Sequence, residues 1–177
     1  MGVPRRPLVV CSLELDALGP MLAALESDFD VHTFALRRDE LRGSGRVPPA
    51  FAGGAVLVVH VVDGRALLLD DDGFYNGFLV ACAHRALGDV FLALAGCETD
   101  SGDLSDAAVV RELSGPQPSV GALAAQRRFL TLGATLNATQ VAHLRGRSLP
   151  PLDVPPGVRA RAASPPKRGA IGLCPIL

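Results

Sequence analysis

The stretch from residue 53 to residue 85, GGAVLVVHVVDGRALLLDDDGFYNGFLVACAHR, decides the fold. Residues 55–62 are apolar and rich in β-branched side chains, which predicts a strong strand. The pair Asp63-Gly64 favours a tight type I′ turn, because glycine adopts positive φ without strain. Residues 66–69 would then pair back antiparallel, and after an aspartate-rich second turn residues 75–83 would add a third strand. We therefore interpret the stretch as a three-stranded antiparallel meander.

Short elements are predicted before this meander. Residues 8–13 (LVVCSL) and residues 30–36 (DVHTFAL) are typical of strands. A short amphipathic helix over residues 20–27 separates them, and Pro20 suits its first position because the missing N–H would be unpaired there anyway.

The segment after the meander allows two interpretations. Leu87, Val90, Phe91 and Leu94 recur at i, i+3, i+4 and i+7, which predicts a helix. A strand over residues 90–95 is the alternative, and it would turn the fold toward α/β.

The last predicted elements are a helix and a hairpin. Ser105 is the expected N-cap of a short helix over residues 105–113. Residues 128–144 indicate a final hairpin with its turn around Asn137. The predicted fold class is therefore α+β, with a mainly antiparallel sheet (meander plus C-terminal hairpin), two or three short helices and a flexible Pro-rich tail.

The size and composition indicate one globular domain, over residues 1–146. The chain has 177 residues, of which 49% are hydrophobic, so wholesale disorder is excluded. The predicted core consists of apolar residues from every expected element: Val9, Val10, Leu22, Leu25, Phe34, Val56, Val58, Leu67, Leu69, Phe78, Val80, Phe91, Leu94, Leu130 and Leu132.

Residues 147–177 are predicted to form a flexible Pro/Arg-rich tail. Seven of the 14 prolines lie at or after Pro150, and periodic apolar patterning stops. From Arg145 onward six basic residues face Asp153 alone, so this part carries a net charge of +5 and residues 1–144 carry −6. A solvated linker is the simplest interpretation, with the alternative of a tail interaction or import cluster formed by Ser164, Pro165, Lys167 and Arg168.

The sharpest enzymatic hypothesis pairs His60 with Cys97. A histidine on one strand, followed about 40 residues later by a strand that ends in cysteine, is the layout of a caspase-like cysteine hydrolase. Glycine does not follow His60, however, and Cys97 lies in LAGCETD and not in a QAC-type motif. His60 is also predicted at mid-strand, where a neighbouring side chain would satisfy it. We therefore predict no catalytic residue and no enzyme, and keep the hydrolase as the alternative.

Metal and cofactor sites are not predicted. Asp70, Asp71 and Asp72 are consecutive, so they point to different sides and at most two could converge on a cation; a solvated turn explains them better. Cys82 with His84, or His143 with any cysteine, does not reach the four ligands of a structural zinc site. No Gly-rich phosphate loop follows a predicted strand.

The composition also bears on partners and compartment. No apolar run approaches the roughly 18 residues that cross a bilayer, so no membrane contact is expected. Nucleic acid is not an expected partner either, except weakly through the basic tail, since the chain has one Tyr and no Trp for stacking. Without a secretory signal the cysteines are expected to be reduced thiols of the cytosol or nucleus, and Pro175 makes Cys174 a poor prenylation site.

Several segments together carry a family resemblance. They are MGVP with VCSL shortly after, ALESDFDVHTFALRRDELRGSGR, GGAVLVVHVVDGRALLLD, FLTLGATLNATQVAHLRG and PPLDVPP. In order and spacing they resemble the small alphaherpesvirus nuclear protein encoded by the fourth gene of the unique long segment, over about residues 1–155. The resemblance implies a viral protein of the host nucleus, associated with nuclear bodies and without an assigned enzyme activity.

The function predicted on this basis is protein–protein interaction in the infected-cell nucleus. The partners would be other viral or host nuclear proteins, bound through an exposed sheet edge or through the tail.

Overall fold

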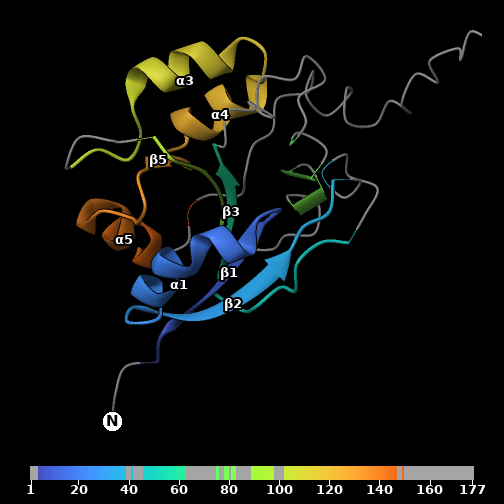
Figure 1. Cartoon of the computed structure of the whole chain (residues 1–177), viewed down its shortest axis with the longest axis vertical. Coiled ribbons are helices and arrows are strands. Elements are labelled where there is room, and N and C mark those ends of the chain that lie inside the picture. The colour runs from blue at the N-terminus through green and yellow to red at the C-terminus, as the bar shows by residue number, and fades with distance from the viewer. Residues whose placement is uncertain are drawn as a thin grey trace, which may run out of the picture.

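In the described part of the chain the fold is a five-stranded sheet with helices on both faces (Figure 1). The computed structural model describes residues 4–38, 41, 46–62, 75, 78–79, 81–82, 89–97, 102–146 and 149. The strand order is β2-β1-β3-β4-β5, and every neighbouring pair is parallel. The strands are β1 (Arg6–Ser12), β2 (Phe29–Ala35), β3 (Ala55–Val61), β4 (Asp89–Ala95) and β5 (Phe129–Leu132).

The central strands are buried on both faces because helices cover both. All seven residues of β4 are buried, and so are the first six of β3. Such strands have near-continuous apolar sequences, AVLVVHV and DVFLALA here, without the alternation of a half-exposed strand.

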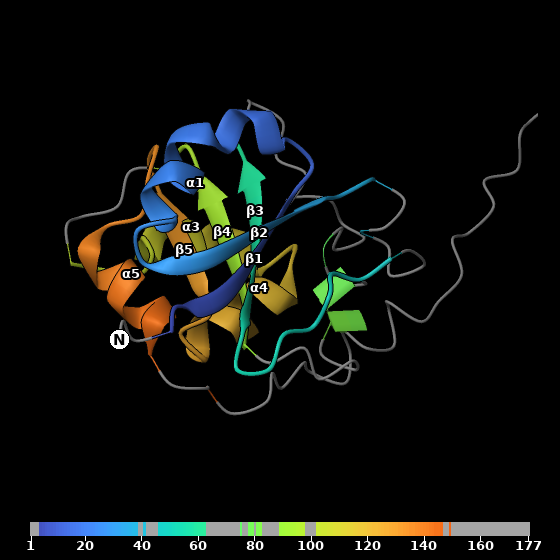
Figure 2. The same cartoon turned by 90° about the horizontal axis from the view of Figure 1, so that it is seen from below.

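Helices connect the strands and form the two outer layers (Figure 2). The chain after β1 forms a 3₁₀ turn and a helix, and three further helices flank β5. They are η1 (Leu15–Leu18), α1 (Gly19–Leu25), α3 (Ala107–Ser114), α4 (Pro118–Ala125) and α5 (Ala138–Arg145). No helix in the described part of the chain is long and apolar enough to cross a membrane.

Each face of the sheet has its own hydrophobic core. On one face α1 and α5 contribute Met21, Leu25 and Leu144 to a cluster with Leu57 and Phe91. The opposite cluster combines side chains from the strands with those of α3, α4 and the helical residues near position 80: Val56, Val58, Leu92, Phe78, Leu79, Cys82, Leu113, Val120 and Leu123.

Two helices begin at side chains that accept backbone hydrogen bonds. The Asp106 carboxylate caps α3 by accepting from the amides of Ala108 and Val109. At α5, Asn137 accepts from the Gln140 amide at 2.8 Å while the Gln140 side chain accepts from the Asn137 amide at 3.0 Å, which is a capping box.

A buried ion cluster holds together the end of the sheet at which the strands begin. Asp89, at the start of β4, is 1% exposed and pairs with Arg6 of β1 and with Arg128, which directly precedes β5. Its carboxylate lies 3.6 Å from the Arg128 guanidinium and also accepts from the Leu149 amide at 2.8 Å. Burial lowers the pKa of Arg128, against the opposing effect of Asp89.

The parallel sheet contradicts the predicted antiparallel one. Both hydrogen-bonding edges of β3 are occupied, by β1 and by β4, so the predicted meander has no edge of β3 to use. Residues 63–74, with the predicted turns and return strand, lie outside the described residues. The third strand predicted from Tyr75 is also wrong, because residues 78, 79, 81 and 82 are helical.

Three predictions further along the chain are corrected as well. The apolar residues from Leu87 to Leu94 do not form a helix; the alternative, a strand over residues 90–95, is right within one residue. The predicted hairpin over residues 128–144 is strand β5 followed by helix α5. The cap of α3 is Asp106 and not Ser105.

The elements predicted before the meander are confirmed within two residues, as β1, α1 with Pro20 in its first turn, and β2. The predicted core is confirmed at its buried members: Val9, Val10, Leu25, Val56, Val58, Phe78, Phe91, Leu94, Leu130 and Leu132. Leu22 and Phe34 are only partly buried.

Candidate functional site

The connections on either side of the β1–β3 pair run to opposite faces of the sheet. After β1 the chain enters α1, which packs on one face, whereas after β3 it reaches Tyr75 and Phe78 in the core of the other face. In open parallel sheets this divergence leaves a crevice beyond the carboxyl ends of the two strands, and ligands bind there. The strand order alone therefore predicts where a ligand would bind, which is beyond the carboxyl ends of β1 and β3.

A cavity of about 350 Å³ occupies that position, and we call it the switch-point pocket. Residues that end or directly follow β1, β2 and β3 form its wall, together with one tyrosine. They are Ser12, Leu13, Glu14, Leu36, Arg37, Arg38, Val59, His60, Val61 and Tyr75.

His60 and Tyr75 form the buried part of this wall. The His60 Nδ1 lies 3.0 Å from the Tyr75 hydroxyl, and the two rings meet edge to face. Burial raises the pKa of Tyr75, and the charge of Glu14 adds to the rise, so the phenol keeps its proton. His60 is thus the penultimate residue of β3, at its carboxyl end and not at mid-strand as predicted, and a neighbouring side chain satisfies its Nδ1.

The remaining polar residues of the pocket come from the ends of β1 and β2. The Ser12 hydroxyl is 1% exposed and accepts a hydrogen bond from the Glu14 amide at 3.1 Å, which leaves its own O–H able to donate. Arg37 and Arg38 lie two and three residues after the end of β2 and are exposed. Among the described residues of the wall Glu14 is the one carboxylate, so the formal charge of the described side chains is +1.

A second candidate site is the outer edge of β2, the first strand of the sheet. The Leu36 amide donates to the Ser12 carbonyl at 2.8 Å, so at even-numbered positions the backbone groups point toward β1. Because these groups alternate along a strand, those of Val31, Thr33 and Ala35 point away from the sheet. Among the described strands none pairs with this edge.

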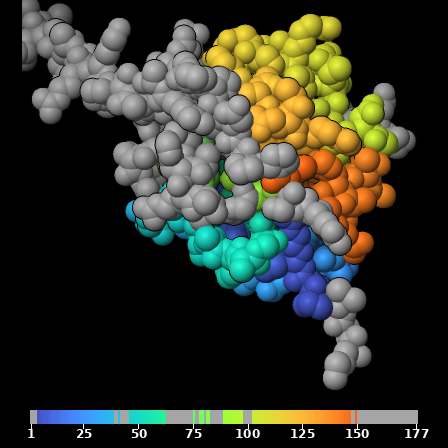
Figure 3. Space-filling view, turned by 180° about the vertical axis from the view of Figure 1, so that it is seen from behind, coloured from blue at the N-terminus to red at the C-terminus, as the bar shows by residue number. Residues whose placement is uncertain are grey.

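Described residues cover the face of β2 that carries His32 and Phe34. The ring of His32 stacks on Phe51 with centroids 4.4 Å apart, and the Arg46 guanidinium lies 5.1 Å from the centre of the Phe34 ring. In the space-filling view, the teal surface that contains these covering residues lies against the blue surface of the N-terminal elements (Figure 3).

The opposite edge of the sheet, at β5, is closed. The outward-pointing amide of Thr131 donates to the Leu104 carbonyl at 3.1 Å, and its carbonyl accepts from the Gln140 side chain at 2.8 Å. The Thr131 hydroxyl accepts from the Asp106 amide at 2.7 Å. At this edge the chain itself thus bonds both outward-pointing backbone groups of Thr131, while the seven-residue edge of β2 is not paired with any described strand.

His60 and Cys97 have different neighbours. Both contribute to the same face of the sheet, but His60 bonds to Tyr75, and among the described residues no cysteine lines the switch-point pocket. Burial raises the pKa of Cys97, and the charge of Asp106 raises it further.

The other described cysteines are buried thiols. Burial raises the pKa of Cys82 to about 12, and burial together with the neighbouring Cys82 raises the pKa of Cys11. Cys82 and His143 lie on opposite faces, since His143 packs edge to face on Phe91 in the cluster with α5. In the part of the chain that the structure describes, no three metal-binding side chains come together.

The other predicted site residues lie outside the described residues. They are Asp70, Asp71, Asp72, His84 and the tail cluster Ser164, Pro165, Lys167 and Arg168. Sequence reasoning missed the pocket residues Ser12, Arg37 and Arg38. The available signal was that each lies within two residues of the end of a predicted strand, but it has meaning only once those strands are known to be parallel neighbours.

Comparisons with known proteins add no relative. No protein-family model matches the chain, and neither the search of curated proteins nor that of solved structures found a match. The resemblance to the alphaherpesvirus nuclear protein thus stays a prediction from the sequence segments quoted above.

Proposed function

We propose that this protein is a non-enzymatic interaction protein of the infected-cell nucleus, and that it binds an extended segment of a viral or host nuclear protein along the outer edge of β2. The observation that carries the proposal is the difference between the two sheet edges. Proteins protect an edge by shortening it, covering it or pairing it. The strand β5 has only four residues, and the outward-pointing amide of Thr131 donates to the Leu104 carbonyl. The seven residues of β2 contain no proline, and Thr33 and Ala35 are exposed.

An added strand would bond to alternate backbone groups of β2. Val31, Thr33 and Ala35 offer three amides and three carbonyls on the outer edge, and a partner segment of about five residues could use them. Main-chain bonds of this kind supply affinity, and the exposed side chains beside them supply selectivity. The nuclear setting and the viral or host partners rest on the family resemblance.

The hydrolase alternative receives little support. A catalytic cysteine needs a thiolate stabilised by the nearby imidazole, which lowers the pKa of the thiol. The pKa of Cys97 is instead raised, with a carboxylate as its charged neighbour, and the Nδ1 of His60 bonds to a phenol.

Proline at position 33 tests the proposal, because it removes an outward-pointing amide and leaves the bonds between β1 and β2 in place. Tagged wild-type chain, Thr33→Pro and Thr33→Ala would each be used to capture partners from infected-cell nuclei, with quantitative mass spectrometry. We expect Thr33→Pro to lose the partners that the wild type and Thr33→Ala retain, while its circular dichroism spectrum and melting temperature show a folded domain.

A second measurement needs no substitution. On partner binding, hydrogen exchange should slow at the amides of Val31, Thr33 and Ala35. Partners that bind folded Thr33→Pro as well as the wild type, or exchange rates unchanged at these amides, would refute the edge proposal. A chain that ends at Arg147 tests the tail separately: if it keeps nuclear location and all partners, the tail has no part in either.

A further inference from the structure

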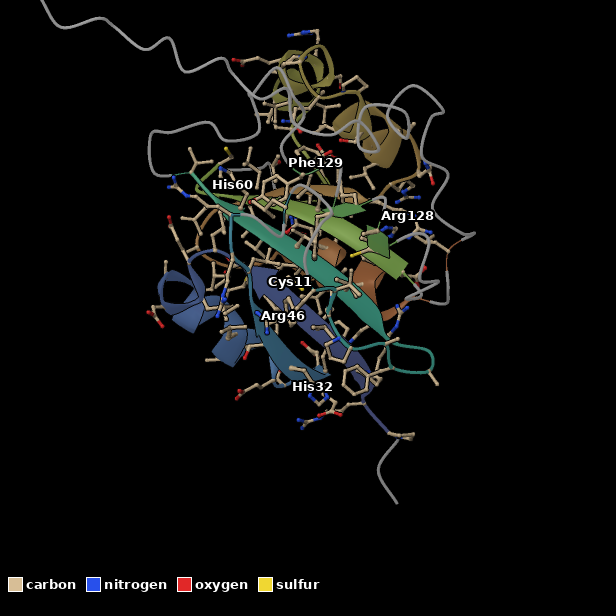
Figure 4. All side chains as sticks on the ribbon, turned by 90° about the vertical axis from the view of Figure 1, so that its right-hand side faces the viewer. Cys11, His32, Arg46, His60, Arg128 and Phe129 are labelled. Carbon is tan, nitrogen blue, oxygen red and sulfur yellow. The ribbon has the colours of Figure 1, made fainter. Side chains whose placement is uncertain are left out.

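The switch-point pocket has a chemical character that interaction along the β2 edge does not require. It lies at the carboxyl ends of β1, β2 and β3, where ligands bind in parallel sheets, and its volume of about 350 Å³ falls within the range of small-molecule sites. Figure 4 places His60 and Arg128 at opposite ends of the sheet, so the pocket is remote from the buried ion cluster.

The pocket combines two cations with buried polar groups. Arg37 and Arg38 are consecutive at the rim, and a guanidinium pairs with phosphate oxygens through two parallel N–H bonds. Deeper in the wall, the Ser12 hydroxyl and the His60 imidazole are almost fully buried. An anionic group at the rim would therefore meet cations, and the rest of the ligand would meet neutral polar groups.

Glu14 narrows the class of ligand. The Glu14 carboxylate repels a bare anion. A pocket that served to bind inorganic phosphate alone would therefore bind it more tightly without this charge. A carboxylate accepts hydrogen bonds from hydroxyl groups, and in dinucleotide-binding folds an acidic residue binds ribose hydroxyls in this way. A ligand with a phosphate and hydroxyl groups uses both signs of charge in the wall.

We propose that the switch-point pocket binds a phosphomonoester of a sugar, either as a free sugar phosphate or as a nucleoside monophosphate. Its phosphate lies against Arg37 and Arg38, and its hydroxyl groups lie toward Glu14. The leucine and valine side chains of the pocket pack against the carbon skeleton. Binding involves no covalent step.

Calorimetric titration of the purified full chain tests the site, with ribose 5-phosphate, uridine 5′-monophosphate and inorganic phosphate as probes. We expect ribose 5-phosphate to bind, and Arg37→Gln and Arg38→Gln each to raise its Kd about tenfold or more, which is the effect of one charged hydrogen bond. Arg111→Gln, an exposed arginine on α3, is the matched control and should leave the Kd unchanged.

Glu14→Gln separates this proposal from a general attraction of anions. It should weaken ribose 5-phosphate about tenfold, yet leave the binding of inorganic phosphate equal or tighter. Tighter binding of the nucleotide than of ribose 5-phosphate would assign the ligand to the nucleotides, and equal binding to the sugar phosphates.

Three results would overturn the proposal: no binding of ribose 5-phosphate at millimolar concentration, an equal loss with Arg111→Gln, or tighter binding of ribose 5-phosphate by Glu14→Gln. None of these results would bear on the proposed binding of a partner along the β2 edge, which partner capture tests separately.

Discussion

Replacing Asp89 by asparagine should strongly destabilise the fold, because it removes one charge of a buried ion pair and keeps the shape. The Asp89 and Arg128 side chains are each 1% exposed, and the charged atoms of the pair lie 3.6 Å apart. At an effective dielectric constant of about 20, two unit charges at that distance attract each other by about 4–5 kcal/mol. Asp89→Asn regains the desolvation energy of the carboxylate but leaves the Arg128 guanidinium buried without its counter-ion, so we expect a net loss of about 3 kcal/mol.

Urea unfolding followed by circular dichroism measures this loss, and the melting temperature should fall by roughly 6–12 °C for a chain of this length. The matched control is Asp28→Asn, which removes one charge of the Arg145–Asp28 pair at the surface. The Arg145 side chain is 52% exposed, so water screens this pair and its loss should cost about 0–1 kcal/mol.

A double replacement completes the test. Asp89→Leu combined with Arg128→Met removes both charges of the buried pair and leaves Arg6 with its bonds to backbone carbonyls. It should be much less destabilising than the sum of the two single changes. If Asp89→Asn costs no more than Asp28→Asn, or if the two replacements at the buried pair are additive, the ion cluster does not hold this end of the sheet together.

Three further predictions concern a cap, a close approach and a thiol. Asn137→Ala removes the capping box of α5 and should cost about 1 kcal/mol in urea unfolding, whereas Asn137→Asp should cost less because aspartate also caps. Gly54→Ala places a Cβ 3.0 to 3.2 Å from three atoms, two of them backbone carbonyl oxygens, and should cost about 1–3 kcal/mol; a neutral result would show that the loop before β3 yields easily. Iodoacetamide should label Cys97 with a pH midpoint above that of a free cysteine, since its pKa is raised and only the thiolate reacts; a midpoint below it would favour the hydrolase alternative.

Local turn chemistry misled the prediction of sheet topology. Asp63-Gly64 after an apolar run is typical of a hairpin, but a turn signal says nothing about whether the neighbouring positions in the sheet are free. The strand β3 pairs on both sides with strands that are distant in sequence. Its near-continuous apolar sequence, AVLVVHV, is itself typical of a strand that is buried on both faces. The helix predicted before Gly96 was wrong for a related reason. All seven residues of β4 are buried, and a continuous run of apolar residues fits the helical spacing as well as it fits a strand.

One missed element had a readable signal. Asn137 and Gln140 stand three residues apart, which is the spacing of a capping box and indicates a helix start, not the tip of a hairpin. The switch-point pocket had no comparable signal. Ser12, Arg37 and His60 come from three strands, and nothing in their spacing places them together until the order β2-β1-β3 is known.

We expect one end of the sheet to stabilise the fold and the other end to bind the ligand, and this separation of roles can be tested. All five strands begin at one end, where Asp89 and Arg128 are buried, and all five finish at the other, where the pocket contains the exposed Arg37. Asp89→Asn should therefore lower the free energy of unfolding while the folded protein keeps its Kd for ribose 5-phosphate. Arg37→Gln should do the reverse, with a Kd raised about tenfold or more and a melting temperature unchanged within about 1–2 °C. If both variants change both quantities together, the pocket is part of the stabilising framework and the separation of roles along the strand direction is wrong.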